Sequence, residues 1–172
     1  LNLPLPLLPL HLLWLNLVTD GAPALALGVD KPEGNVMKRK PREMNEPLLK
    51  GLVPLIVWSG IISTLIVLGM FYFYLDSGEM KARSIALTLL MVFELFLAFS
   101  VRSERSIFTL KNNFYLWIAV FASLLMHLLI MYTPLNIAFK LVPLTFFDWT
   151  LVILLGSTGL IFFEVKKLIF PA

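Results

Sequence analysis

The sequence predicts an all-α protein, a polytopic bundle of about five helices that cross a membrane. Of its 172 residues, 59% are hydrophobic and only 15% are charged, and the mean hydropathy is +0.87. Soluble domains are roughly 45–50% apolar and about 25% charged, so this composition argues against a soluble fold. The apolar residues also gather in runs close to the ~20 residues that a membrane-spanning helix needs.

The apolar runs and the polar connections between them define a single transmembrane domain over residues 1–172. Residues 1–8 are expected to be the tail of a preceding helix. A span interrupted by glycine and proline follows, then one long polar connection and four further spans. The predicted order is a broken span at 10–28, a connection at 29–50, and spans at 51–75, 84–102, 114–133 and 148–165.

The basic residues are distributed unequally between the two sides of the predicted membrane. Eleven fall on the side that holds connection 29–50 and the C-terminus, and three fall on the opposite side. Cytoplasmic loops carry an excess of lysine and arginine, so connection 29–50 and the C-terminus are predicted to be cytoplasmic. The net charge of +3 therefore reflects topology, and we expect a lipid bilayer as a partner and no nucleic acid.

The first span carries a group of polar residues at membrane depth. Asn16, Thr19 and Asp20 stand at positions i, i+3 and i+4, a spacing that places all three on one face of an α-helix. Gly21 and Pro23 follow, and proline has no N–H to donate to the carbonyl one turn earlier. We therefore expect the helix to open near Thr19–Gly21. Open helices at membrane depth line cavities and build ion sites in many transporters.

Amide, hydroxyl, carboxylate and carbonyl oxygens are hard ligands that suit Ca²⁺, Mn²⁺, Na⁺ or Mg²⁺. Glu94 is the lone acidic residue of the span 84–102, and two carboxylates neutralise one divalent cation. We predict that Asn16, Thr19, Asp20 and Glu94 bind a metal ion, with further ligands from outside this chain. Two other interpretations stay open, a proline kink with polar groups satisfied by neighbouring helices, and a protonated Glu94 hydrogen-bonded to another helix.

The remaining chemistry-bearing residues indicate no further site. His11 and His127 lie in apolar runs without the partners that a metal site needs, so we expect both to have packing roles. The chain has no cysteine, which excludes disulfides and cysteine-ligated metals. The sequence shows neither a nucleophile–base arrangement nor a glycine-rich phosphate loop. We therefore predict no catalytic and no cofactor-binding residues.

Residues 13–28, with the sequence LWLNLVTDGAPALALG, resemble the sixth transmembrane helix of P-type cation-transporting ATPases of the calcium-pump branch. The resemblance continues through VDKPE at 29–33 and MKRKPR at 37–42, which are similar to the cytoplasmic loop after that helix. It resumes at FELF, residues 93–96, in the eighth helix, and at YTPL, residues 132–135, near the end of the ninth. The resemblance covers essentially the whole chain, from the end of the fifth helix through the tenth.

The resemblance implies that Asn16, Thr19, Asp20 and Glu94 occupy cation-ligand positions of that family. In its two-site pumps, the aspartate is shared between both sites and the glutamate belongs to one of them. One position departs from the pattern, because relatives often have asparagine three residues after the glutamate, where this chain has Leu97. Further ligands belong to the fourth and fifth helices, so the number of ions carried per cycle stays open.

The resemblance also implies a function. We expect the chain to be the C-terminal membrane part of a P-type ATPase, a translocase that carries Ca²⁺ with ATP as its energy source. ATP and Mg²⁺ bind only in the missing phosphorylation and nucleotide-binding domains of such a pump, so this chain alone would not hydrolyse ATP. Its partners would be the lipid bilayer and the missing N-terminal part of the pump. Two alternatives stay open, a pump for Mn²⁺, Na⁺ or H⁺, and a truncated membrane protein with a structural or regulatory role.

Overall fold

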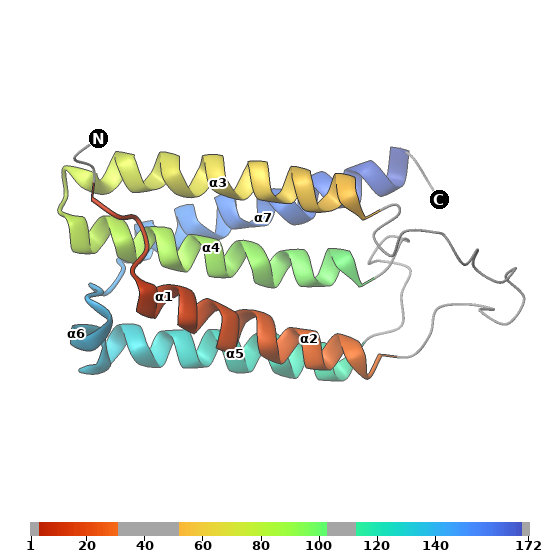
Figure 1. Cartoon of the computed structure of the whole chain (residues 1–172), viewed down its shortest axis with the longest axis horizontal. Coiled ribbons are helices and arrows are strands. Elements are labelled where there is room, and N and C mark those ends of the chain that lie inside the picture. The colour runs from red at the N-terminus through yellow and green to blue at the C-terminus, as the bar shows by residue number, and fades with distance from the viewer. Residues whose placement is uncertain (1–3, 31–51, 103–112, 170–172) are drawn as a thin grey trace, which may run out of the picture.

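The computed structural model describes residues 4–30, 52–102 and 113–169, and regular structure in these residues is entirely helical (Figure 1). Five helical segments are long and apolar enough to cross a membrane, which confirms the predicted all-α bundle of about five spans. These segments are Pro9–Gly28, Val53–Leu75, Glu79–Val101, Phe114–Tyr132 and Phe146–Lys167. The predicted connection 29–50 lies outside the described residues except for its first two.

The first span is one continuous helix made of three parts. These are α1 (Pro9–Trp14), the π-helix η1 (Leu15–Asp20) and α2 (Gly21–Gly28) (Figure 1). The interruption expected near Thr19–Gly21 is therefore present as a wider helical turn, and the backbone does not unwind there. Gly21 itself keeps right-handed helical angles, with φ −62° and ψ −50°.

The second and third spans, α3 (Val53–Leu75) and α4 (Glu79–Val101), form an antiparallel hairpin. Each has 23 residues and is about 35 Å long at 1.5 Å per residue, enough for a hydrocarbon core of about 30 Å. The tight turn between them depends on Gly78, whose φ of 109° is a conformation that other residues rarely adopt. An i,i+4 ion pair of 2.8 Å between Glu79 and Arg83 supports the first turn of α4.

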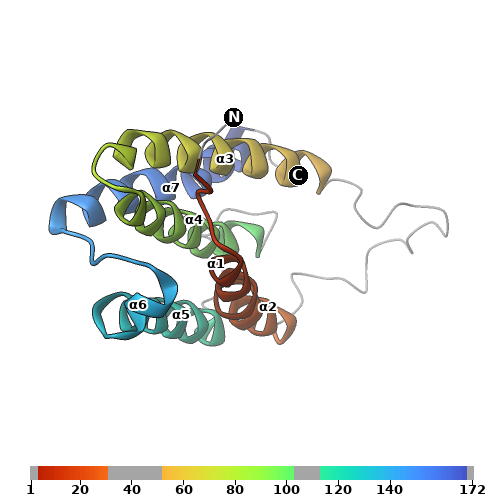
Figure 2. The ribbon, with the colours of Figure 1, turned by 60° about the vertical axis from the view of Figure 1, so that its left-hand side comes forward.

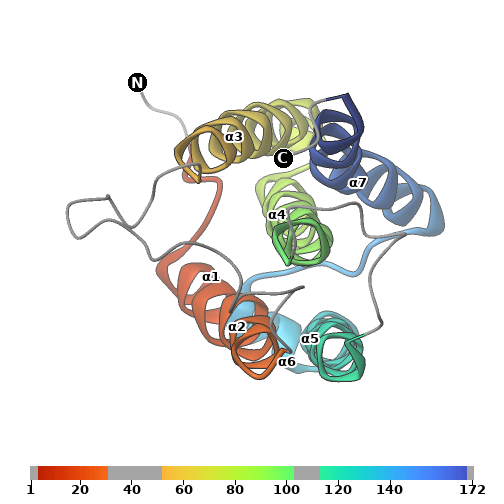
Figure 3. The same ribbon diagram turned by 90° about the vertical axis from the view of Figure 1, so that its right-hand side faces the viewer.

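The helix α4 lies at the centre of the bundle, with the other spans arranged around it in a view along the helix axes (Figure 3). Its residues from Ala82 to Phe93 are almost continuously buried. A helix that is apolar on all sides is suited to such a position, because each of its faces meets another helix. Glu94, the residue after this buried stretch, is half-buried.

The fourth span, α5 (Phe114–Tyr132), packs against η1 and α2 (Figure 1). Asn113 caps its N-terminus, because Oδ1 accepts a hydrogen bond from the Leu116 N–H at 3.1 Å. The same side chain donates from Nδ2 to the Ala26 carbonyl of α2 at 3.2 Å. The cap therefore also fixes the ends of two neighbouring spans to each other.

A short helix, α6 (Leu135–Phe139), follows α5 and was not expected from the hydropathy of the sequence. It ends at Lys140, which has a left-handed φ of 52°. The chain then crosses to the start of the last span, α7 (Phe146–Ile169), as Figure 2 shows. This crossing separates α5 from α7 and leaves α4 between them (Figure 3).

Close contact between α4 and α7 depends on two glycines of α7. A Cβ atom at Gly156 would lie 2.7 Å from Val92 Cγ1, and one at Gly159 would lie 2.6 Å from Phe93 Cε2. Small residues let membrane helices approach closely, so that packing contacts between them are made along the full interface. These glycines therefore set the position of the α4 backbone next to Glu94.

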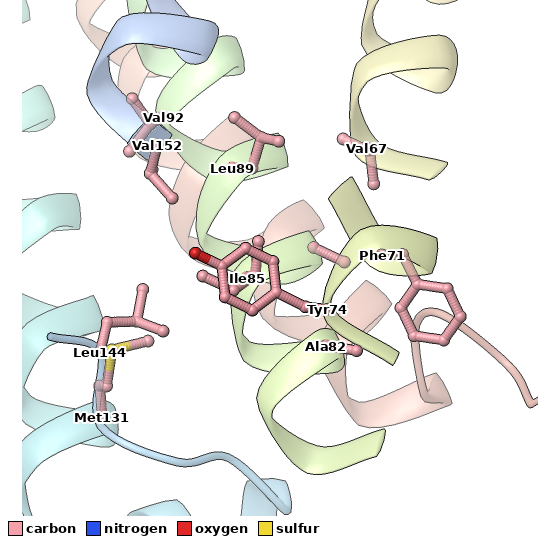
Figure 4. Close-up of a cluster of buried hydrophobic side chains, with 11 residues drawn as sticks. Val67, Phe71, Tyr74, Ala82, Ile85, Leu89, Val92, Met131, Leu144 and Val152 are labelled. Atoms are coloured by element: carbon pink, nitrogen blue, oxygen red, sulfur yellow. The ribbon is translucent and has the colours of Figure 1, made fainter. Parts of the chain in front are cut away.

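The largest buried cluster among the described residues joins α3, α4 and α7 with Met131 of α5 and with Leu144 (Figure 4). Its side chains interlock in the interior of the bundle, where close packing gives the dispersion contacts that hold membrane helices together. A second cluster joins η1, α4 and α5. Its members are Leu15, Leu87, Met91, Leu95, Ile130 and Leu141.

Charged side chains tie the spans together at both ends of the bundle. At one end, Asp148 of α7 accepts from Tyr74 Oη at 2.8 Å and forms an ion pair of 3.0 Å with Lys81. At the other end, Lys167 donates to Glu164 at 2.8 Å and to the Ser100 carbonyl of α4 at 2.6 Å. The hydrogen bonds and ion pairs offset the desolvation cost of burying these charges.

Candidate cation site

The π-helix η1 holds three of the four predicted ligands, and its geometry separates them. Thr19 is buried, with 2% of its surface exposed, whereas Asn16 and Asp20 are exposed on the outer face of the span. A π-helix has i→i+5 hydrogen bonds, so its residues are distributed around the axis differently from those of an α-helix. The expected single face is therefore not present, and only Thr19 points into the described bundle.

The local sequence explains why the helix changes its hydrogen-bond pattern here. Pro23 provides no N–H, so the Thr19 carbonyl four residues earlier loses its α-helical donor. The neighbouring Val18 carbonyl accepts from the side chain of Ser123 on α5, with an Oγ–O distance of 2.7 Å. A neighbouring helix thus donates to the backbone of the π-helix at membrane depth.

Glu94 belongs to α4, the helix that packs against the π-helix η1. Oxygen Oε2 of Glu94 is enclosed by protein and has no hydrogen-bond partner among the described residues. An acidic group at membrane depth is costly, and a bound cation would offset that cost.

Buried polar atoms without partners occur on the first span, α4 and α5. Within the described residues, four buried side-chain atoms lack a hydrogen-bond partner: Trp14 Nε1, Thr19 Oγ1, Glu94 Oε2 and His127 Nδ1. Two of the four are oxygen atoms of predicted ligands. Buried oxygens without partners are rare in folded proteins and cost roughly 1–3 kcal/mol each, so their occurrence calls for an explanation. A cation bound in the complete protein provides one.

The donor set fits a hard cation better than a soft one. Threonine hydroxyl, asparagine amide and carboxylate oxygens are the ligands that Ca²⁺ prefers, and Ca²⁺ takes six to eight of them. The described residues contain no group of three or more histidine, cysteine, aspartate or glutamate side chains that could hold a metal. Only two of the four predicted residues, Asp20 and Glu94, are of these types.

Both histidines are buried, and their hydrogen bonds give them structural roles within the described bundle. His11 Nδ1 accepts from the Leu8 N–H at 3.2 Å, and Nε2 donates to the Phe139 carbonyl at 2.6 Å, which links α1 to α6. His127 Nε2 lies 3.0 Å from Thr88 Oγ1 and links α5 to α4. Neither contact is visible in the hydropathy of the sequence.

Sequence reasoning also missed Ser123, because a serine in an apolar helix is unremarkable by itself. The only signal was its spacing, since Ser123 and His127 are four residues apart and share one face of α5. Their partners, Val18 and Thr88, are 105 and 39 residues away along the chain. Such long-range pairs become recognisable only once the helices are placed.

The fold defines a polytopic helical membrane protein, and unpartnered oxygens on two of its spans are typical of the ion-transporting class. The comparison with known families is specific. Residues 4–169 match the family described as "Cation transporting ATPase, C-terminus", and the chain belongs to this family.

Relatives from distant organisms agree with this assignment. The chain is 42% identical to a calcium-transporting ATPase of Bacillus subtilis (strain 168). The matched region covers 89% of this chain and 18% of that protein. It is 35% identical to a calcium-transporting ATPase of Plasmodium falciparum, over 97% of this chain and 18% of that protein. It is 30% identical to an endoplasmic reticulum-type calcium-transporting ATPase of Arabidopsis thaliana, over 97% of this chain and 20% of that protein. The chain spans about a fifth of the length of these relatives. The resemblance to the C-terminal region of the calcium-pump branch is confirmed.

Proposed function

We propose that this chain is the C-terminal membrane part of an ATP-driven pump that carries Ca²⁺ across a membrane. The observation that carries the proposal is the pair of buried oxygens, Thr19 Oγ1 and Glu94 Oε2, that lack partners among the described residues. Both belong to residues that the sequence pattern marks as ligands. The relatives named calcium-transporting ATPases support Ca²⁺ as the transported ion.

In this proposal, Asn16, Thr19 and Asp20 of η1 and Glu94 of α4 each supply oxygen ligands to the transported ion. The exposure of Asn16 and Asp20 places their side chains on a face open to helices from the rest of the pump. Those helices complete the shell. When the ion leaves, the two carboxylates lose their counter-charge and take up protons, so the pump exchanges protons for Ca²⁺.

The energy source lies in the rest of the pump. ATP and Mg²⁺ bind there, and this chain contributes no nucleotide site. Connection 29–50 lies on the cytoplasmic side in the proposed orientation and couples the membrane helices to the phosphorylated domain. The C-terminus lies on the same side.

The decisive test of the site is Asp20→Asn in the full-length pump. The change removes one of the two charges that neutralise the ion, so we expect Ca²⁺-dependent phosphorylation by ATP to be lost or to need at least about tenfold more Ca²⁺. The matched control is Asp76→Asn, at an exposed position in the turn between α3 and α4. If both variants are phosphorylated like the unmodified pump, Asp20 is not a ligand.

The same assay identifies the transported ion. Phosphorylation measured with Ca²⁺, Mn²⁺ or Na⁺ as the only added transport ion should respond to Ca²⁺ at the lowest concentration. Stronger stimulation by Mn²⁺ or Na⁺ would assign the pump to another cation and leave the four ligand positions unchanged.

A further inference from the structure

The helix α5 contacts both elements that carry predicted ligands. On one side, Ser123 Oγ donates to the Val18 carbonyl of η1 at 2.7 Å, one residue before Thr19. On the other side, His127 is hydrogen-bonded to Thr88 of α4 at 3.0 Å. Ser123 and His127 are almost fully buried, with 1% and 0% of their surface exposed.

The direction of the bond between α5 and α4 follows from the number of donors. A threonine hydroxyl has one hydrogen to donate, and Thr88 Oγ1 donates it to the Ser84 carbonyl at 2.7 Å. His127 Nε2 must therefore be the donor to Thr88, since the hydroxyl oxygen is left as an acceptor. The side-chain Oγ of Ser84 separately accepts from the Val142 N–H at 2.7 Å, which ties α4 to the segment after α6.

The spacing of Ser123 and His127 places both side chains on the same face of α5. Four residues correspond to about one helical turn, so Ser123 and His127 lie about 6 Å apart along the same face of α5. Ser123 reaches the backbone of η1 and His127 reaches α4, between which the proposed ion binds. The helix α5 therefore adds polar links to both helices, beside their direct apolar packing.

We propose that Ser123 and His127 are positioning residues that hold η1 and α4 at the separation at which Thr19, Asp20 and Glu94 bind one ion. This inference rests on the proposed function. Ser123 acts by holding the Val18 carbonyl of the π-helix against α5. Without the hydroxyl, that link between the two helices is lost, and the ligands next to Val18 can shift.

The test is Ser123→Ala in the full-length pump, with the Ca²⁺ concentration that gives half-maximal phosphorylation as the readout. We expect this concentration to rise about fivefold to tenfold, while the maximal phosphorylation at saturating Ca²⁺ stays near that of the unmodified pump. Ser123→Thr keeps the hydroxyl and should restore the original value. At the second position, His127→Leu should weaken Ca²⁺ binding, and His127→Gln, which keeps an N–H donor, should weaken it less.

The matched control is Ser157→Ala on α7, because that hydroxyl donates within its own helix, to the Leu154 carbonyl at 2.8 Å. The positioning role is overturned if Ser123→Ala behaves like Ser157→Ala, or if it lowers maximal phosphorylation without changing the half-maximal Ca²⁺ concentration. An unmodified pump without any Ca²⁺-dependent phosphorylation would instead refute the proposed function. The two failures are therefore distinguishable.

Discussion

Two acidic residues of the described bundle, Asp148 and Glu94, differ in their hydrogen bonding. Asp148 is buried, and its two carboxylate oxygens have partners on α3, on α4 and at Thr145 before α7. Glu94 is half-buried, and one of its oxygens has no partner within the described bundle. A buried carboxylate with a complete set of hydrogen-bond donors stabilises a fold. A carboxylate with an unpaired oxygen is suited to binding a ligand. The same residue type thus has different roles because its surroundings differ.

At the residue scale, we predict that Asp148→Ala destabilises the protein by about 2–3 kcal/mol, the value for hydrogen bonds to a charged group in a buried place. The change leaves Tyr74 Oη and the Thr145 N–H without their acceptor and Lys81 without its counter-charge. Thermal unfolding in detergent measures the effect. Asp76→Ala, in an exposed turn, serves as the control and should not change the midpoint. Equal midpoints for the two variants would contradict the structural role of Asp148.

At the element scale, the helices are placed by a few local features of sequence and not by amphipathic faces. Glycines bring α7 against α4, Gly78 closes the α3–α4 turn, and Pro23 favours the π-helix. In a membrane, apolar surface is no reason for two helices to associate, so close packing and hydrogen bonds decide their arrangement. This explains why small residues and single hydroxyl groups have large effects here.

We predict that Gly159→Leu separates α7 from α4, because its Cβ alone would lie 2.6 Å from the Phe93 ring. Overpacking of this kind costs about 1–3 kcal/mol, and the displaced α4 backbone should also weaken Ca²⁺ binding through Glu94. Thermal unfolding and Ca²⁺-dependent phosphorylation of the full-length pump measure the two effects. Gly60→Leu on α3, where no neighbouring atom lies within 4 Å, should change neither. If Gly159→Leu unfolds and is phosphorylated like the unmodified pump, α7 accommodates the larger side chain without displacing α4, and the prediction is wrong.

At the scale of the whole molecule, the bundle is asymmetric. The central helix α4 is enclosed, and the first span presents Asn16 and Asp20 on an open face. The relatives are about five times longer than this chain, so we expect other helices of the pump to pack on that face. The orientation of the bundle in the membrane is a separate expectation that can be tested directly.

We predict that Val29 lies on the cytoplasmic side and Ser77 on the opposite side. Both are exposed, and the chain has no cysteine of its own to interfere with labelling. In the pump with any other cysteines replaced, Val29→Cys should react with a membrane-impermeant thiol reagent only from the cytoplasmic side. Ser77→Cys should react only from the other side. The reverse pattern would show that the topology is opposite to the one proposed. Labelling after permeabilisation of the membrane checks that both cysteines can be reached by the reagent.

The sequence by itself determined the class and the number of spans, because hydrophobic length is a local property that each segment carries alone. It also marked Asn16, Thr19, Asp20 and Glu94, since polar groups at membrane depth are costly. The form of the first span was decided by tertiary structure. A proline predicts a lost hydrogen bond, but whether the helix opens or becomes a π-helix depends on what its neighbours offer.

Ser123 supplies a hydrogen bond to the Val18 carbonyl from 105 residues away, and that contact accompanies a continuous π-helical span. The burial of Thr19 and the exposure of Asn16 and Asp20 follow from the same turn. Likewise, the roles of His11 and His127 depend on Phe139 and Thr88, which only the packed bundle brings within reach. Local composition therefore places the helices in the membrane, and contacts between distant segments decide which polar atoms remain free to bind an ion.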